Sequence, residues 1–102
     1  MNKVKITVVK KCYFEELVKE FGIEGFPICD AQEVGQSWIT RGDKPEGLCI
    51  GAWSSMYPEV YAMVHGKVNF YDHGWLEKET DAMVACHDGL RPVIYHLECI
   101  SE

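Results

Sequence analysis

The alternation of side chains in the last quarter of the chain is the feature that most constrains the fold. Residues 92–100 alternate, so one side of an extended strand would carry only apolar side chains and a thiol. These are Val93, Tyr95, Leu97 and Cys99. Residues 82–86 have the small and β-branched composition of a second strand. Asp88-Gly89 lies between the two segments, and this pair is typical of hairpin loops, so the sequence predicts a C-terminal β-hairpin.

Two more strands and a helix are predicted from the first part of the chain. Residues 3–11 alternate and are rich in β-branched side chains, which indicates a strand. An apolar stripe at helical spacing follows, and Gly22 after it is typical of a helix end. The stripe consists of Phe14, Leu17, Val18 and Phe21. Residues 36–40 predict a further short strand.

A second helix is predicted in the middle of the chain. Ser54 and Ser55 can each cap a helix N-terminus, and Pro58 would then lie in the first turn, where its missing N–H costs little. Residues 67–80 show no clear period, and Trp75 is expected to anchor them. The expected buried stripe of the helix is Trp53, Tyr57, Val60, Tyr61 and Val64.

These elements follow one another in the order β-α-β-α-β-β. A chain of 102 residues, 47% hydrophobic and 25% charged, has the size and composition of one globular domain. We therefore predict a single α+β domain over residues 1–102. In it, two helices pack on one face of a small sheet that ends in the C-terminal hairpin.

Charge and hydropathy argue against two classes of partner. The net charge is −6 and there is no basic stripe to neutralise phosphates, so nucleic acid binding is not expected. No apolar run approaches the ~20 residues of a transmembrane helix, and the alternating N-terminus lacks the apolar run of a signal peptide. With 5 cysteines, an odd number, free thiols or metal ligands are expected instead of a disulfide framework. Together these features predict a cytoplasmic protein.

Three cysteine-containing segments resemble a family of small proteins from bacteria and archaea, frequent in anaerobes, to which no function is assigned. The resemblance covers nearly the whole chain, and the last segment is the most distinctive. The segments are Cys29 with Val34-Gly35-Gln36, then Lys44-Pro45-Glu46-Gly47-Leu48-Cys49 with Ala52-Trp53, and finally Cys86 with Asp88-Gly89-Leu90-Arg91-Pro92-Val93.

The resemblance implies a shared fold and draws attention to Cys29, Cys49 and Cys86, but it implies no activity. This chain departs from the family pattern at two positions. Asp30 follows Cys29 where the family has proline, and His87 stands where a second cysteine often lies. The second change replaces one soft metal ligand by another.

Cys29, Cys49, Cys86 and His87 form a candidate metal site. The cysteines are predicted on Gly- and Pro-rich loops and at a strand end, where sites are usually built. Three thiolates with an imidazole suit zinc or an iron–sulfur cluster. His87 directly follows Cys86, so the two would share an ion only if a bulge or turn begins there. There is no Cys-x-x-Cys pair, so three separate loops must converge.

Cys49 also supports a second hypothesis, a thiol-dependent redox or transferase enzyme. It would lie a few residues before the second helix, whose dipole favours a thiolate if the loop folds back. Such a nucleophile also needs a base within reach, and the candidates are His65 and His87.

Asp88, Arg91 and Trp53 are candidate substrate-binding residues. Arg91 could hold a carboxylate or phosphate through two hydrogen bonds. Alternatively, Asp88 caps the hairpin turn and pairs with Arg91 across it. Trp53 belongs to an aromatic set that could line a pocket or form core and subunit contacts.

A third hypothesis is a small-molecule or protein interaction module in which the cysteines only pack, as Cys12 and Cys99 are expected to do. His65 suits the end of its helix, whereas His73 and His96 are expected to be solvated or locally bonded. The many large apolar residues exceed what a small interior can hold, which predicts a homo-oligomer.

Overall fold

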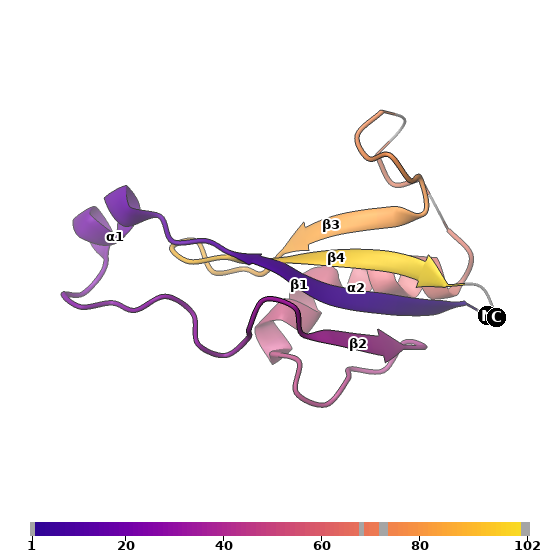
Figure 1. Ribbon diagram of the computed structural model, residues 1–102, viewed down its shortest axis with the longest axis horizontal. Coiled ribbons are helices and arrows are strands. Elements are labelled where there is room, and N and C mark those ends of the chain that lie inside the picture. Colours follow the sequence, from indigo (N-terminus) through magenta and orange to yellow (C-terminus); the bar gives the residue numbers. More distant parts are fainter. Residues whose placement is uncertain (1, 68, 72–73, 101–102) are drawn as a thin grey trace.

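A computed structural model describes residues 2–67, 69–71 and 74–100 and shows a four-stranded sheet with a helix packed on it (Figure 1). The strands pair antiparallel in the order β2-β1-β4-β3. The predicted α+β class, the element order and the C-terminal hairpin are confirmed. The elements are β1 (Lys3–Lys11), α1 (Glu15–Phe21), β2 (Ser37–Thr40), α2 (Ile50–Val64), β3 (Asp81–Ala85) and β4 (Val93–Ile100).

Strands β1 and β4 form the centre of the core. Their inward side chains are each at most 1% exposed, and burying one large aliphatic side chain stabilises a fold by about 1.5–3 kcal/mol. Ile6 lies opposite Leu97, and Val8 lies opposite Tyr95. The alternation of apolar and polar side chains in the sequence therefore corresponds to the alternation of buried and solvent-facing positions along these strands. The inward set is Val4, Ile6, Val8, Val93, Tyr95 and Leu97.

Helix α2 begins earlier than predicted. It starts at Ile50 with Cys49 as its N-cap, so Pro58 lies inside the helix and not in its first turn. The buried stripe is also different, because small or flexible side chains face the sheet while Tyr57 and Tyr61 are exposed. Burial of this stripe outweighs the backbone hydrogen bond lost at Pro58. The stripe consists of Ala52, Met56, Val60, Met63 and Val64.

Helix α1 packs against no other helix or strand in the described part of the chain. The backbone N–H of Cys12 donates to Pro92 at 2.8 Å, and that of Phe14 donates to Leu90 at 2.8 Å. These bonds carry the chain past the end of the sheet before α1 starts, so the helix projects from one end (Figure 1). The prediction that both helices pack on one face is therefore wrong for α1. None of the described helices is long and apolar enough to cross a membrane.

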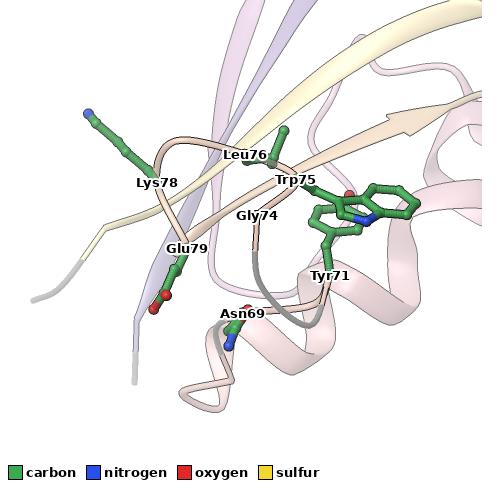
Figure 2. A pocket seen from close by; sticks show the side chains of 7 residues that line it. All are labelled: Asn69, Tyr71, Gly74, Trp75, Leu76, Lys78 and Glu79. Atoms are coloured by element: carbon green, nitrogen blue, oxygen red, sulfur yellow. The ribbon is translucent and has the colours of Figure 1, made fainter.

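The connection between α2 and β3 is irregular, as predicted, but Trp75 does not anchor it. The Trp75 side chain is 74% exposed and stacks on Tyr71, with ring centroids 4.8 Å apart (Figure 2). A cavity of about 10 Å³ beside the rings has room for no more than one water molecule. The predicted role of His73 lies outside the described residues. The cavity is lined by Asn69, Tyr71, Gly74, Trp75, Leu76, Lys78 and Glu79.

The hydroxyl group of Tyr71 covers the free edge of β3. It accepts a hydrogen bond from the N–H of Met83 at 2.8 Å and donates one to the carbonyl of Met83 at 3.0 Å. The N–H of Asp81 donates to the carbonyl of Lys78 at 3.1 Å. Unpaired strand edges are templates for pairing with other chains. The connection therefore protects the sheet from edge-to-edge association.

Removing the Tyr71 hydroxyl should weaken the fold and open this edge. Tyr71→Phe keeps the ring but removes both hydrogen bonds to the backbone of Met83, which are exposed, so we expect the free energy of unfolding to fall by about 0.5–1.5 kcal/mol. Urea unfolding measures this loss, and light scattering at rising concentration measures association through β3. Tyr61→Phe, on the exposed side of α2, is the matched control. Unchanged stability of Tyr71→Phe would contradict the protective role.

Candidate thiol site

Three cysteines lie on segments near one buried tyrosine, Tyr95. Tyr95 lies on β4 and faces α2 from the core. Burial is the main cause that raises the pKa of its phenol, and the charges of Cys86, Cys49 and Cys29 raise it further. A charge shifts a pKa in this way only when it lies nearby. Cys29, Cys49 and Cys86 therefore lie in the wider surroundings of Tyr95, and Cys29 and Cys86 pack against the core.

Cys49 occupies the N-terminal end of α2. It is the N-cap residue, and among the five cysteines, all of which the structure describes, it is the exposed one. Four backbone N–H groups at a helix start have no partner within the helix, and the helix dipole favours negative charge there. The sequence had placed Cys49 several residues before the helix, because the serines looked like better caps.

The side chain of Gln32 joins the segments that carry the site. It is only 2% exposed, and its amide nitrogen donates to the carbonyl of Gly47 at 3.1 Å. Its oxygen accepts the backbone N–H of Cys49 at 3.1 Å and lies 3.5 Å from the Tyr95 hydroxyl. A buried amide without partners would be costly, so these contacts hold the N-terminus of α2 against β4.

Cys86 is held by the hairpin itself. Its backbone N–H donates to the carbonyl of Val93 at 3.0 Å, and the N–H of Val93 donates to the Cys86 sulfur at 3.3 Å. The thiol is therefore directed toward β4. His87, the next residue, is exposed.

Cys29 lies on the irregular segment between α1 and β2, and Arg91 positions that segment. The Arg91 guanidinium donates to the carbonyls of Pro27 at 3.1 Å and Ile28 at 3.5 Å. It also lies over the ring of Phe26, 4.5 Å from the centroid. The hairpin turn therefore holds the Cys29 segment in place from a distance of more than sixty residues along the chain.

Asp88 caps the hairpin turn, which was the second alternative from the sequence. Its carboxylate accepts the N–H groups of Leu90 at 2.9 Å and Arg91 at 3.0 Å, and pairs with Arg91 Nε at 3.0 Å. Burial alone would raise the pKa of Asp88, but these hydrogen bonds outweigh it and lower the pKa. The hydrogen bond that Arg91 donates to Asp88 raises the pKa of Arg91 in turn. Arg91 is thus engaged within the protein, and its predicted role in binding an anion gains no support.

The thiols do not form a ready metal site. In residues 2–67, 69–71 and 74–100, no three His, Cys, Asp or Glu side chains stand close enough together to hold a metal ion as they are. Cys29, Cys49 and Cys86 share the surroundings of Tyr95, but His87 does not complete a set of ligands with them.

The remaining candidates lie along α2. Trp53 follows Cys49 by one helical turn, packs partly on the core, and lies 5.5 Å from the ring of Tyr57. It lines a shallow, open cavity with Ser54, Tyr57 and Pro58. His65 is the C-cap of this 15-residue helix, about 22 Å from its start at 1.5 Å per residue, so it cannot serve Cys49 as a base.

The predictions for Cys99 and His96 agree with the structure. Cys99 packs against the core and its sulfur lies 3.8 Å from the carbonyl of Met63. Cys12 is half-buried at the end of β1. His96 is locally bonded, with Nε2 2.8 Å from a carboxylate oxygen of Asp81.

Two residues of the site, Tyr95 and Gln32, were not singled out from the sequence. Tyr95 was recognised as an inward residue of the last strand, which was the available signal, but not as the centre of the thiols. Gln32 lies in an irregular segment, and nothing in its sequence context indicates that a glutamine there is buried.

Comparisons with protein-family models, with curated proteins and with solved structures find no match to this chain. The resemblance noted in the sequence therefore stays a prediction. The function has to be argued from the geometry around Tyr95.

The raised pKa of Tyr95 predicts a loss of stability at high pH. In the unfolded chain the phenol ionises near pH 10, whereas in the fold it keeps its proton to higher pH. The contribution of Tyr95 is fully present below about pH 10. Above that pH the folded state binds more protons, so the free energy of unfolding falls by up to about 1.4 kcal/mol per pH unit.

Urea unfolding at about pH 8 and about pH 11 tests this expectation, because only the second value lies above the ordinary tyrosine pKa. Tyr95→Phe should lose less stability between the two values than the wild type does. Tyr61→Phe, which removes an exposed phenol, should behave like the wild type. The same pH dependence in all three proteins would contradict the assignment.

Proposed function

We propose that the protein binds a thiophilic metal ion or an iron–sulfur cluster through Cys29, Cys49 and Cys86. The observation that supports this proposal is that three separate segments bring these cysteines near Tyr95. Gln32 contacts both Cys49 and Tyr95, Val93 contacts the Cys86 sulfur, and Cys29 packs against the same core. Thiolates are the preferred protein ligands of zinc and of iron–sulfur clusters. His87 is the candidate for a further ligand.

Binding would draw the thiols closer together than they stand. Cys86 is fixed by the hairpin, whereas Cys49 is exposed and Cys29 lies on an irregular segment, so these two are the ones to adjust. Metal binding often completes the folding of a site in this way.

Anaerobic purification followed by elemental analysis and a visible spectrum tests the proposal. We expect stoichiometric zinc, or iron with the absorption of a cluster. The triple variant Cys29→Ser, Cys49→Ser, Cys86→Ser should lose the metal, because serine is a poor ligand for soft metals.

The double variant Cys12→Ser, Cys99→Ser is the matched control and should keep the metal. Colourless wild-type protein with sub-stoichiometric zinc and iron would end the metal proposal. If the triple variant also kept its fold and partners, the thiols would be packing residues of an interaction module.

One observation favours the second candidate, a thiol-dependent redox or transferase enzyme. Cys49 combines exposure with a place at the start of α2, and reactive thiols are often found at helix N-termini. His87 would be the base, since His65 lies at the far end of the helix.

This candidate predicts that Cys49 reacts first with an alkylating agent. Limited treatment with iodoacetamide and peptide mass spectrometry would show modification of Cys49 before Cys29 or Cys86, and Cys49→Ser should remove the fast phase. Cys99→Ser should leave that phase unchanged. Five thiols that react equally slowly would exclude an activated cysteine. Protection by added metal would instead favour the first candidate.

A cytoplasmic location belongs to the same proposal. All five cysteines are unpaired, which is the usual state of thiols in a reducing compartment. A metal or redox function based on thiolates also needs them to stay reduced.

A further inference from the structure

Helix α1 exposes the apolar side chains that a helix normally buries. Phe21 is 71% exposed and Ile23, just after the helix, is 75% exposed, while Phe14 and Leu17 are also open to solvent. A helix of seven residues is not stable in water by itself and depends on packing. These four side chains form an exposed apolar patch. A phenylalanine side chain covers ~200 Å², so the partly exposed patch measures roughly 400 Å², which is the size of an interaction site.

A second uncovered surface is the face of the sheet that lies away from α2. In Figure 1, α2 lies behind the sheet and no helix lies in front of it. The pairing register puts Lys5 beside Ile39, Lys10 beside Ile94, and Lys3 beside Ile100 on this face. Ile39 is 58% exposed, and Met83 on β3 is exposed as well. The acidic residues of this face are Asp81 on β3 and Glu98 on β4, and Glu98 lies opposite Lys5.

Helix α1 cannot cover the open face of its own sheet. The bonds from Cys12 to Pro92 and from Phe14 to Leu90 direct it past the end of the strands. The hydroxyl of Tyr13 adds a bond of 2.7 Å to the carbonyl of Phe26. Folding back would break these contacts, so a helix that covers this face would come from another molecule.

We propose that two copies of this chain exchange their α1 helices, each helix packing on the open sheet face of the other copy. The charges favour this pairing, because α1 carries Glu15, Glu16 and Glu20 against a single Lys19. On the face, Lys3 and Lys10 of β1 lie opposite isoleucines of β4 and not opposite acidic residues. The exchange is reciprocal, so a two-fold axis closes it. We call α1 with its apolar patch the arm. If both arms bury their patches against equal areas of the two sheet faces, the interface covers roughly 1,600 Å² in total, the standard size of a stable complex.

Sedimentation or light scattering over micromolar to submillimolar concentrations tests the exchange. We expect a dimer that weakens as salt is added, because salt screens the charge contacts. Phe21→Asp on the arm and Ile39→Asp on the face change exposed residues, so each should keep the fold, as circular dichroism would show. Each should raise the dissociation constant by about tenfold or more, which is at least 1.4 kcal/mol. Val34→Asp, an exposed apolar residue outside both surfaces, is the control and should stay dimeric.

Mixing the two variants separates this arrangement from other pairings. A heterodimer would join the intact arm of the Ile39→Asp chain to the intact face of the Phe21→Asp chain, so the mixture should associate more strongly than either variant alone. Pairing of α1 with α1 would show no such rescue, and a monomeric wild type would mean that another molecule covers α1. Either result would overturn the proposal. None of these outcomes depends on metal or on thiol chemistry.

Discussion

The pairing of β1 with β4 is the contact on which the other elements depend. These strands lie in the middle of the sheet, so β2 is attached only through β1 and β3 only through β4. Their inward side chains are almost completely buried and form the surface on which α2 packs. Burial of this surface is the main stabilising contribution available to so small a domain. A change that moves one strand by a residue would turn its whole apolar face outward.

This central pair also determines where the thiols can meet. Tyr95 is an inward residue of β4, and Val93, two residues before it, fixes the Cys86 thiol. The start of α2 and the segment between α1 and β2 are then brought to the same place by Gln32. Each thiol is held by a different kind of contact, and the rigid strand under them is the common reference. The site is therefore built by the scaffold and not by any local cysteine motif.

The strands could be predicted because alternation is a local property of the sequence, and the hairpin because Asp88 and Gly89 carry their own turn preference. The start of α2 could not be predicted, because Ser54 and Ser55 are better helix caps in isolation than Cys49. Burial of the helix against the sheet decides where the helix begins. Gln32 was missed for a related reason: its partners Gly47 and Tyr95 are 15 and 63 residues away in the chain. The grouping of Cys29, Cys49 and Cys86 could be suggested from the sequence because all three lie on predicted loops or at a strand end.

The contacts of Arg91 have a consequence for how the thiols behave together. One guanidinium holds the carboxylate of the hairpin turn and the carbonyls next to Cys29, so two segments that are distant in the chain are joined at a single side chain. Cys86 sits at the other end of the same turn. Any displacement of Cys29 must therefore pull on the turn that holds Cys86, and the reverse is also true. Arg91 is therefore the side chain through which the segment of Cys29 and the turn beside Cys86 are tied to each other.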